Sequence, residues 1–373
     1  MKRSTFFLLC LEGAVLSFNV AATAALVPAI AADLAVEPFI VGRIIWFYML
    51  PYGVAALLYG PLVRAFDAKK VELICLFLFS LSNILAGVAA SINMLFLARF
   101  FMGVFGASVI PLGLILISKH VKDLERGKSV GIFFGATFIA SLLGLFLSGI
   151  INWRLIYLIP GYLGLGLCLF IWLYLPSFKQ VGEKFRLNYL DTFKNKRVCA
   201  IFGYIFLVSV LYHGVQQWLG VYFARELGLN QFLISMLITL TSLSGVFGEI
   251  AGGKLSDKAG RVKTVNIGIA LMILSVFLLL VRLPVGFLAI IMVIWGLGWT
   301  FNHAALSTML TDLPHRYLHE AASLNSGVRF ISGGIGTAIS GVLMAKSFNL
   351  GFLVLGVSLV LLTLSAKKLL LVK

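Results

Sequence analysis

The chain contains 373 residues, of which 61% are hydrophobic and 12% are charged. A soluble domain carries about 25% charged residues, so this composition excludes a soluble enzyme and indicates a protein that crosses a membrane many times. The formal net charge of +16 comes from basic residues in short segments between apolar runs, which is typical of cytoplasmic loops and not of a nucleic-acid-binding surface. The four cysteines show neither an extracellular pair nor the spacing of metal ligands, so neither a disulfide framework nor a zinc site is predicted. No cofactor is expected.

Apolar runs separated by polar breaks predict an all-α protein with twelve membrane helices, because about 20 apolar residues span a bilayer. The first run follows Lys2 and Arg3 as in a signal peptide, but Glu12 interrupts it and no soluble domain follows. We therefore interpret it as an uncleaved first helix. The predicted helices cover residues 5–31, 41–63, 71–91, 93–117, 127–150, 153–176, 198–223, 230–254, 263–282, 284–311, 321–346 and 349–366.

The longest polar break, residues 177–197, is rich in lysine and arginine and divides the chain into two halves. Residues 1–176 and 198–373 each hold six predicted helices, an arrangement that fits a parallel repeat about an axis along the membrane normal. With the N-terminus inside, the outer segments contain few cations, namely Arg43, Arg154, Arg225, Arg282 and Lys346. Most of the other basic residues fall on the inner side, which predicts a cell-membrane protein with both termini in the cytoplasm.

A short charged segment separates the eighth and ninth predicted helices, with the sequence Gly253-Lys-Leu-Ser-Asp257-Lys258-Ala-Gly260-Arg261. Its spacing predicts a tight cytoplasmic turn, and it resembles the loop signature of the major facilitator superfamily. The resemblance implies two pseudo-symmetric six-helix halves that alternately expose a central site, with a small-molecule substrate. It also implies a monomer surrounded by membrane lipid.

The first half holds a degraded copy of this segment, which begins at Gly60 and has Arg64 where the family has an aspartate. The family's acid lies near the start of the eleventh helix, where the positive end of the helix dipole favours an anion. Arginine reverses that charge. Two interpretations remain open, namely that Arg64 pairs with Glu320 at the predicted start of that helix, or that it is solvated and unpaired.

The fourth predicted helix contains Arg99 followed by Gly103 and Gly106, which resembles a second motif of the family. An arginine inside a membrane helix is expected to face the bundle interior and find acceptors. We expect those acceptors at Asn19, Thr23 and the carbonyl groups of the first helix. Arg99 then either holds helices together or takes part in coupling.

The fifth predicted helix departs from the pattern of proton-coupled drug exporters in this family. Those proteins carry a Gly-Pro pair followed by two glycines, whereas this chain has Gly144-Leu145 and then Ser148-Gly149. The missing proline weakens the exporter interpretation, although the small residues still allow close helix packing.

The resemblance implies that helices 1, 4, 7 and 10 line the central cavity. On helix 1, Glu12, Asn19 and Thr23 follow the spacing i, i+7, i+11 and share one face. A carboxyl group in a medium of low dielectric exchanges a proton when its hydration changes, so Glu12 is a candidate for proton coupling. The alternative is a hydrated carboxylate with a structural role.

Helices 7 and 10 add aromatic and polar side chains of the kind that form small-molecule sites. The candidates are Tyr212, His213, Gln216 and Gln217 on helix 7, and Trp295, Trp299, Asn302 and His303 on helix 10. His213 and His303 are candidates for substrate or proton contact, with packing as the alternative. Glu249 on helix 8 and Arg329 on helix 11 lie at similar depth and are predicted to form a structural ion pair.

Three functions remain open on these observations. The first is proton-coupled export of a small amphipathic organic compound. It is favoured because the sequence from Leu26-Val-Pro28 onward resembles that of the twelve-helix drug:proton antiporters. The second is an uptake carrier or facilitator for a metabolite, and the third is a transport-inactive sensor or scaffold. Sodium coupling is also open, although so few membrane acids make a poor cation site.

Overall fold

The computed structural model describes residues 3–121, 123–175, 189, 194–312 and 315–370. The described residues form helices, and the chain divides into two compact units, Met1–Leu187 and Asn188–Lys373. The division falls within the predicted linker. Within these described ranges, eleven helices are long and apolar enough to cross a membrane, and one bent pair adds a twelfth candidate span. The predicted fold class is thereby confirmed.

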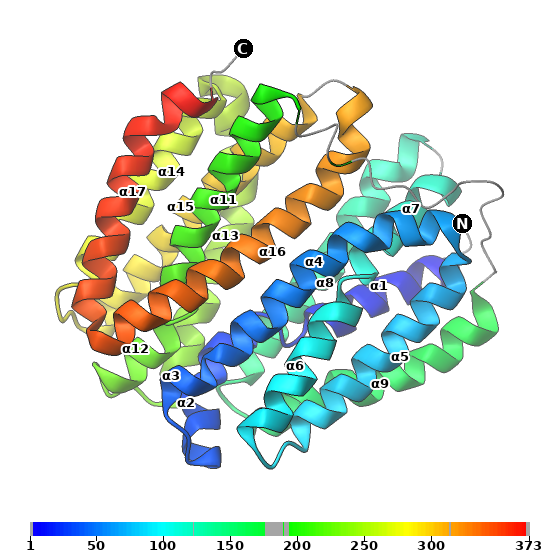
Figure 1. The fold of residues 1–373 in the computed structure, drawn as a ribbon, viewed down its shortest axis with the longest axis horizontal. Helices are drawn as coiled ribbons and strands as arrows, with labels where there is room; N and C mark the ends of the chain where they lie inside the picture. The colour runs from blue at the N-terminus through cyan, green and yellow to red at the C-terminus, as the bar shows by residue number, and fades with distance from the viewer. Residues whose placement is uncertain (1–2, 122, 176–188, 190–193, 313–314, 371–373) are drawn as a thin grey trace. The chain divides into compact units, whose positions relative to one another are not determined.

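Unit 1 runs from blue to green in Figure 1. Its core is built by α5 packing on α9 and α6, by α4 packing on α6, and by α1 packing on α8 and α9. Its helices are α1 (Arg3–Ser17), α2 (Ala22–Leu34), α3 (Pro38–Val41), α4 (Arg43–Ala65), α5 (Ala68–Gly87), α6 (Ile92–Gly106), α7 (Val109–His120), α8 (Asp123–Leu147) and α9 (Trp153–Tyr174).

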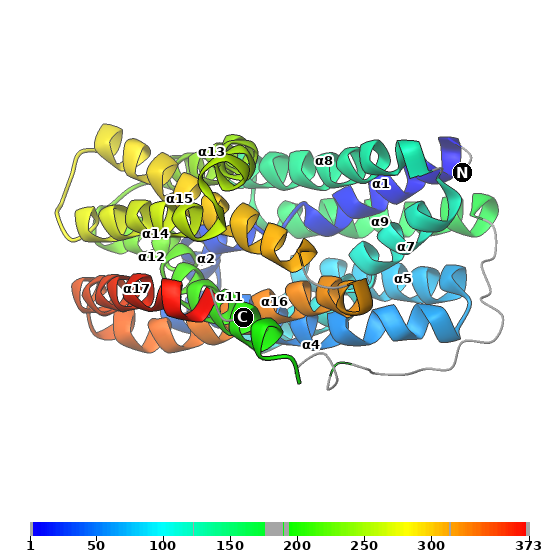
Figure 2. The same cartoon turned by 90° about the horizontal axis from the view of Figure 1, so that it is seen from above.

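Unit 2 runs from green to red, and its helices are seen end-on and from the side in Figure 2. Here α15 packs on α13 and α14, α11 packs on α16, and α17 packs on α14 and α11. Its helices are α11 (Lys196–Gln216), α12 (Leu219–Arg225), α13 (Gln231–Ala259), α14 (Arg261–Leu278), α15 (Val285–Thr311), α16 (His315–Lys346) and α17 (Phe348–Leu370).

Short polar side chains set where several helices begin. Asp67 accepts a hydrogen bond from the backbone N–H of Lys69 at 3.0 Å at the start of α5, and Asn230 accepts one from Leu233 at 3.0 Å at the start of α13. Such caps satisfy N–H groups that have no partner within the helix. They place each helix start within a few residues of the predicted boundary.

The first predicted helix is not continuous. It is broken between Ser17 and Ala22, and its two parts, α1 and α2, meet at a bend of 43°. No proline or glycine lies between these residues, so the sequence carries no signal for the break. The α8 helix crosses closely at this point, because a Cβ atom on Gly144 would meet the carbonyl oxygen of Phe18.

The charged segment after the eighth span was expected to form a turn, and this expectation was wrong for most of its length. The α13 helix continues through Gly253, Asp257 and Lys258 to Ala259, and only Gly260 leaves the helix before α14 begins. Gly260 has φ 94° and ψ 152°, a conformation that only glycine adopts readily. The reversal is therefore made by a single residue.

Candidate functional site

Three aromatic rings form a stack in unit 2, between α11 and α15. The ring of Tyr212 lies parallel to Trp299, with centroids 3.9 Å apart, and parallel to Trp295, with centroids 5.1 Å apart. Tyr212 and Trp295 are buried, whereas Trp299 is partly exposed. Trp299 is therefore the partly accessible member of the stack, and it packs against the buried ring of Tyr212.

Polar atoms surround this aromatic stack. Trp295 donates from Nε1 to Oε1 of Gln216 at 2.8 Å, which leaves the amide NH2 group of Gln216 as a donor. His213 lies edge-on to Trp299, and its Nδ1 is 2.9 Å from the carbonyl oxygen of Ser209. Because a carbonyl oxygen only accepts, Nδ1 carries the hydrogen, and Nε2 of the neutral ring can accept a hydrogen bond from a ligand.

An acid and an imidazole meet one helical turn further along α15. Nδ1 of His303 lies 2.6 Å from Oε1 of Glu249 on α13, with side chains 35% and 41% exposed. The contact is an ion pair when the ring is protonated. His303 also lies 6.2 Å from Trp299 between ring centroids, so this charge-bearing pair adjoins the aromatic face.

Arg329 reaches the same cluster from α16. Its Nε donates to Oδ1 of Asn325 at 2.8 Å, its Cζ lies 5.7 Å from the Trp299 ring, and its Nη1 is buried without a hydrogen-bond partner among the described residues. The predicted ion pair of Glu249 with Arg329 is absent from the described part of the chain. Glu249 contacts His303 instead, because α13 packs on α15.

The close crossing of α11 and α16 brings Arg329 to the stack. A Cβ atom on Gly336 would meet the carbonyl oxygen of Val210, and Trp218 donates from Nε1 to the carbonyl oxygen of Thr337 at 3.0 Å. The glycine therefore permits the contact between α11 and α16, and the indole of Trp218, at the start of α12, adds a hydrogen bond to α16 just beyond it.

Two predicted cavity residues of unit 2 lie elsewhere. Asn302 is fully buried against α14, where its Nδ2 lies 3.9 Å from Sδ of Met272 and 2.9 Å from the carbonyl oxygen of Gly298. It is a packing residue in this structure because α14 and α15 are in close contact. Gln217 caps the C-terminus of α11 and is partly exposed.

In unit 1, the polar face predicted on helix 1 points toward α5 and α9. Nδ2 of Asn19 donates to Oδ1 of Asn83 at 2.6 Å, and the hydroxyl groups of Thr23 and Tyr157 lie 3.1 Å apart. Both predicted cavity residues are thus occupied by buried contacts inside the unit. The spacing identified the shared face correctly but not the helices that it meets.

Glu12 belongs to this same polar face, and it lies opposite an acid that the sequence analysis did not select. That acid is Glu72 of α5, which is also fully buried. An acid one turn inside an apolar run, at a depth similar to that of Glu12, is the signal that could have identified it.

Arg99 has a different acceptor from those predicted. Its Nε donates to the carbonyl oxygen of Ile44 on α4 at 3.2 Å, and its Cζ lies 4.4 Å from the ring of Tyr48. A Cβ atom on Gly103 would meet the Tyr48 carbonyl oxygen, so the glycine lets α6 approach α4. The expected acceptors on helix 1 were wrong because α6 packs on α4.

The charged segment of unit 2 has an internal ion pair. Nη1 of Arg261 lies 2.5 Å from Oδ1 of Asp257, and Nε of Arg261 lies 3.4 Å from Oδ2 of Asp312. These contacts join the C-terminal end of α13 to the start of α14 and the C-terminal end of α15.

The corresponding segment of unit 1 begins at Gly60, which lies within α4. The predicted pairing of Arg64 with Glu320 involves side chains outside the described ones.

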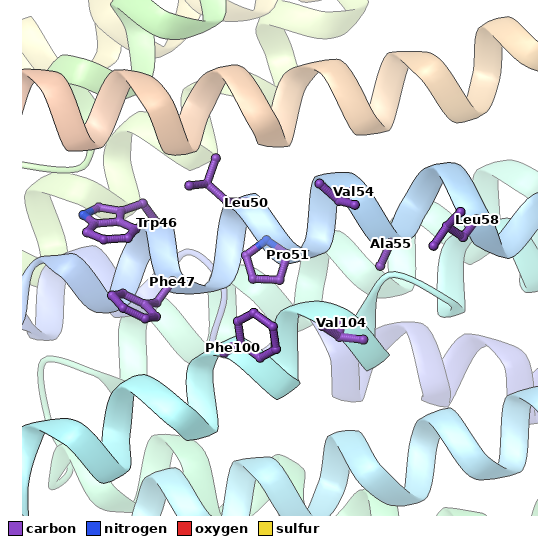
Figure 3. A pocket seen from close by; sticks show the side chains of 9 residues that line it. All are labelled: Trp46, Phe47, Leu50, Pro51, Val54, Ala55, Leu58, Phe100 and Val104. Carbon is purple, nitrogen blue, oxygen red and sulfur yellow. The ribbon is translucent and has the colours of Figure 1, made fainter. Parts of the chain in front are cut away.

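An apolar groove of about 480 Å³ follows α4 and α6 in unit 1. Figure 3 shows the side chains that line it, among them Trp46, Phe47, Pro51 and Phe100. Phe47 stacks on Trp46 and on Phe96, with centroids 4.5 Å and 4.6 Å apart. No polar stripe marks this surface in the sequence, so its residues are absent from the predicted site.

The model of the Major Facilitator Superfamily matches residues 9–341. The chain belongs to this superfamily. Among its relatives, a riboflavin transporter, RibZ, from Clostridioides difficile (strain 630) is 23% identical over 86% of this chain and 84% of its own length. Multidrug resistance protein 3 of Bacillus subtilis (strain 168) is 22% identical over 81% of this chain and 72% of its own length.

Solved transporter structures share the fold. The crystal structure of the nucleoside transporter NupG superposes with a TM-score of 0.79 at 16% identity and covers 99% of each chain. The chain is therefore a multi-pass membrane transporter of this superfamily.

Proposed function

We propose that this transporter exports a small amphipathic organic compound with a planar aromatic part, in exchange for protons. The observation that carries the proposal is the stack of Tyr212 with Trp295 and Trp299, which presents an aromatic face beside imidazole, amide and carboxylate groups. Aromatic pairs contribute roughly 0.5–1.5 kcal/mol beyond the area that they bury. A planar ligand on Trp299 gains this term, and the polar rim orients it.

Proton coupling is supported by the acids inside the spans. Glu12 and Glu72 are buried without a cation partner among the described residues, and Glu249 contacts an imidazole that can accept a proton. Charged groups in membrane spans are expensive to bury and mark ion or proton pathways. We further propose that the protein lies in the cell membrane with both termini in the cytoplasm. It would work as a monomer.

Flux into proteoliposomes tests this function. We would reconstitute the protein, select inside-out molecules by protease accessibility of the loops, and measure uptake of tetraphenylphosphonium and riboflavin. An acidic lumen is expected to drive uptake, because protons leave the lumen as the compound enters. Flux that does not respond to the proton gradient would contradict coupled export.

The aromatic site has a matched control within the chain. Trp299→Leu removes the stacking face, whereas Trp172→Leu removes an indole on α9 that is 61% exposed. We expect the first change to weaken apparent substrate affinity by roughly 2- to 13-fold, from the loss of one aromatic pair. Equal affinity in the two variants would show that the substrate does not contact Trp299.

An uptake carrier is the second candidate. It is favoured by the absence of the Gly-Pro pair at Gly144-Leu145 and by the likeness to riboflavin and nucleoside transporters. The same liposomes distinguish it, because uptake would then require the opposite gradient or none.

A further inference from the structure

Two carboxyl groups face each other in the interior of unit 1. Glu12 of α1 is 1% exposed and Glu72 of α5 is 0% exposed, and the two groups lie close enough to interact directly. Oε1 of Glu12 and both side-chain oxygens of Glu72 have no hydrogen-bond partner in good geometry among the described residues. Both residues lie within membrane-spanning helices.

The surroundings offer no compensating charge in the described part of the chain. The titratable neighbours are Cys75 of α5 and Cys168 of α9, whose thiols are neutral near pH 7. The Cys75 thiol donates to the Tyr59 hydroxyl of α4 at 3.4 Å. The ammonium group of Lys69, one turn before Glu72, donates instead to the carbonyl oxygen of Trp172 at 2.8 Å.

Two carboxylates in contact cannot both remain ionised in such a place. Burying one unpaired charge costs several kcal/mol, and a second like charge beside it adds repulsion that low dielectric does not screen. One proton held between the two groups removes a charge and supplies the donor that their oxygens lack. Acid pairs that share a proton in this way titrate as a unit.

We propose that Glu12 and Glu72 form a dyad that binds the coupling proton, at a place inside unit 1 that is separate from the aromatic site. The inference rests on the proposed proton-coupled function. When α1 and α5 separate and water enters, the shared proton passes to water and leaves two hydrated carboxylates. When the helices close, one proton returns from water, and the dyad then carries one negative charge instead of two.

The bend in the first span provides the movement that this requires. The α1 helix ends at Ser17, five residues after Glu12, and α2 continues after the break. Thr23 of α2 holds Tyr157 of α9 at 3.1 Å. A small change of angle at the break therefore alters the spacing of α1 and α5 at Glu12 while the contact of α2 is kept.

The transport test compares Glu12→Gln, Glu72→Gln and a control, Glu125→Gln, which changes an exposed glutamate on α8. Tetraphenylphosphonium is measured in two ways, as accumulation driven by an imposed proton gradient and as exchange with the compound on both sides. Glutamine has the shape of a protonated glutamate, so each dyad variant is expected to keep exchange. Gradient-driven accumulation should fall to the level measured without a gradient, while Glu125→Gln should behave as the wild type does.

A spectroscopic measurement gives an answer that does not depend on transport. Infrared difference spectra of the purified protein across a pH titration report the C=O stretch of protonated carboxyl groups. The wild type and Glu125→Gln should show this band near neutral pH, and the double variant Glu12→Gln/Glu72→Gln should lack it. A band that persists in the double variant overturns the dyad, whether or not the variant transports.

The outcomes separate this inference from the function on which it rests. If wild-type flux does not respond to the gradient, the proposed coupled function and the coupling role of the dyad both fall. If the wild type responds and both single dyad variants respond equally, only the dyad is overturned. Loss of the response in Glu249→Gln, with both dyad variants responding, would place the proton at the contact with His303 instead.

Discussion

The crossing of α8 over the break in the first span can be tested by adding one methyl group. In Gly144→Ala, the new Cβ atom would meet the carbonyl oxygen of Phe18 and would lie 2.7 Å from its carbonyl carbon. Ordinary contact between carbon atoms begins at roughly 3.5 Å. The two backbones must therefore separate by at least about 1 Å, because the carbonyl oxygen lies nearer still, and neither can rotate away as a side chain could.

Gly135 of the same helix provides the matched control, since nothing lies within 4 Å of a Cβ atom there. Both variants gain about 1 kcal/mol of helix propensity from replacing glycine with alanine, so their difference isolates the clash. Overpacking costs about 1–3 kcal/mol. We expect Gly144→Ala to be less stable than Gly135→Ala by this amount, which is about 5- to 150-fold in the unfolding equilibrium constant.

The measurement is equilibrium unfolding of the purified protein in mixed micelles, followed by the fluorescence of its six tryptophans. Exchange transport in liposomes provides a second readout, because displacement of the break would disturb α1 and α2 together. Equal stability of the two variants would refute the close crossing, and with it the explanation for glycine at this position.

Three further changes test other parts of unit 2. Trp295→Phe keeps the ring but leaves Oε1 of buried Gln216 without its donor, so stability in the same assay should fall by about 1–3 kcal/mol. Gly260→Ala forces a side chain into a glycine-only conformation and should cost about 1–3 kcal/mol, whereas Gly253→Ala, with open space around it, should be neutral or slightly stabilising. Asp257→Asn removes an ion pair whose carboxylate is 71% exposed and should change stability by less than about 1 kcal/mol. A large loss of transport rate would then identify a role in movement.

The sequence was sufficient to predict the fold because hydrophobicity and length mark membrane spans almost independently of tertiary contacts. The twelve candidate spans and the family follow from apolar runs and from the charged segment around Asp257. The break after Ser17 could not be predicted, because it depends on the approach of α8 and not on any residue at the bend.

The candidate site was less predictable for a related reason. Helical spacing shows which side chains share a face, as for Glu12 and Asn19, but not which helix covers that face. The partners Glu72 and Asn83 both come from α5, at least sixty positions away. For the same reason, similar depth along the helices predicts a pair of Glu249 with Arg329, whereas Glu249 contacts His303 on the neighbouring α15.

Several of the membrane spans among the described residues are interrupted, and these interruptions relate the fold to movement. The breaks include those that separate α1 from α2, α6 from α7, and α11 from α12. Irregular backbone at membrane depth persists only where protein or a water-filled cavity satisfies its polar groups. Asn19, which donates to Asn83, lies within the break between α1 and α2, and the break before α12 follows Gln216 of the aromatic site. Bending at either break therefore acts on a polar contact within its own unit, so that the proposed proton-binding and substrate-binding groups can each respond to a change in helix angle.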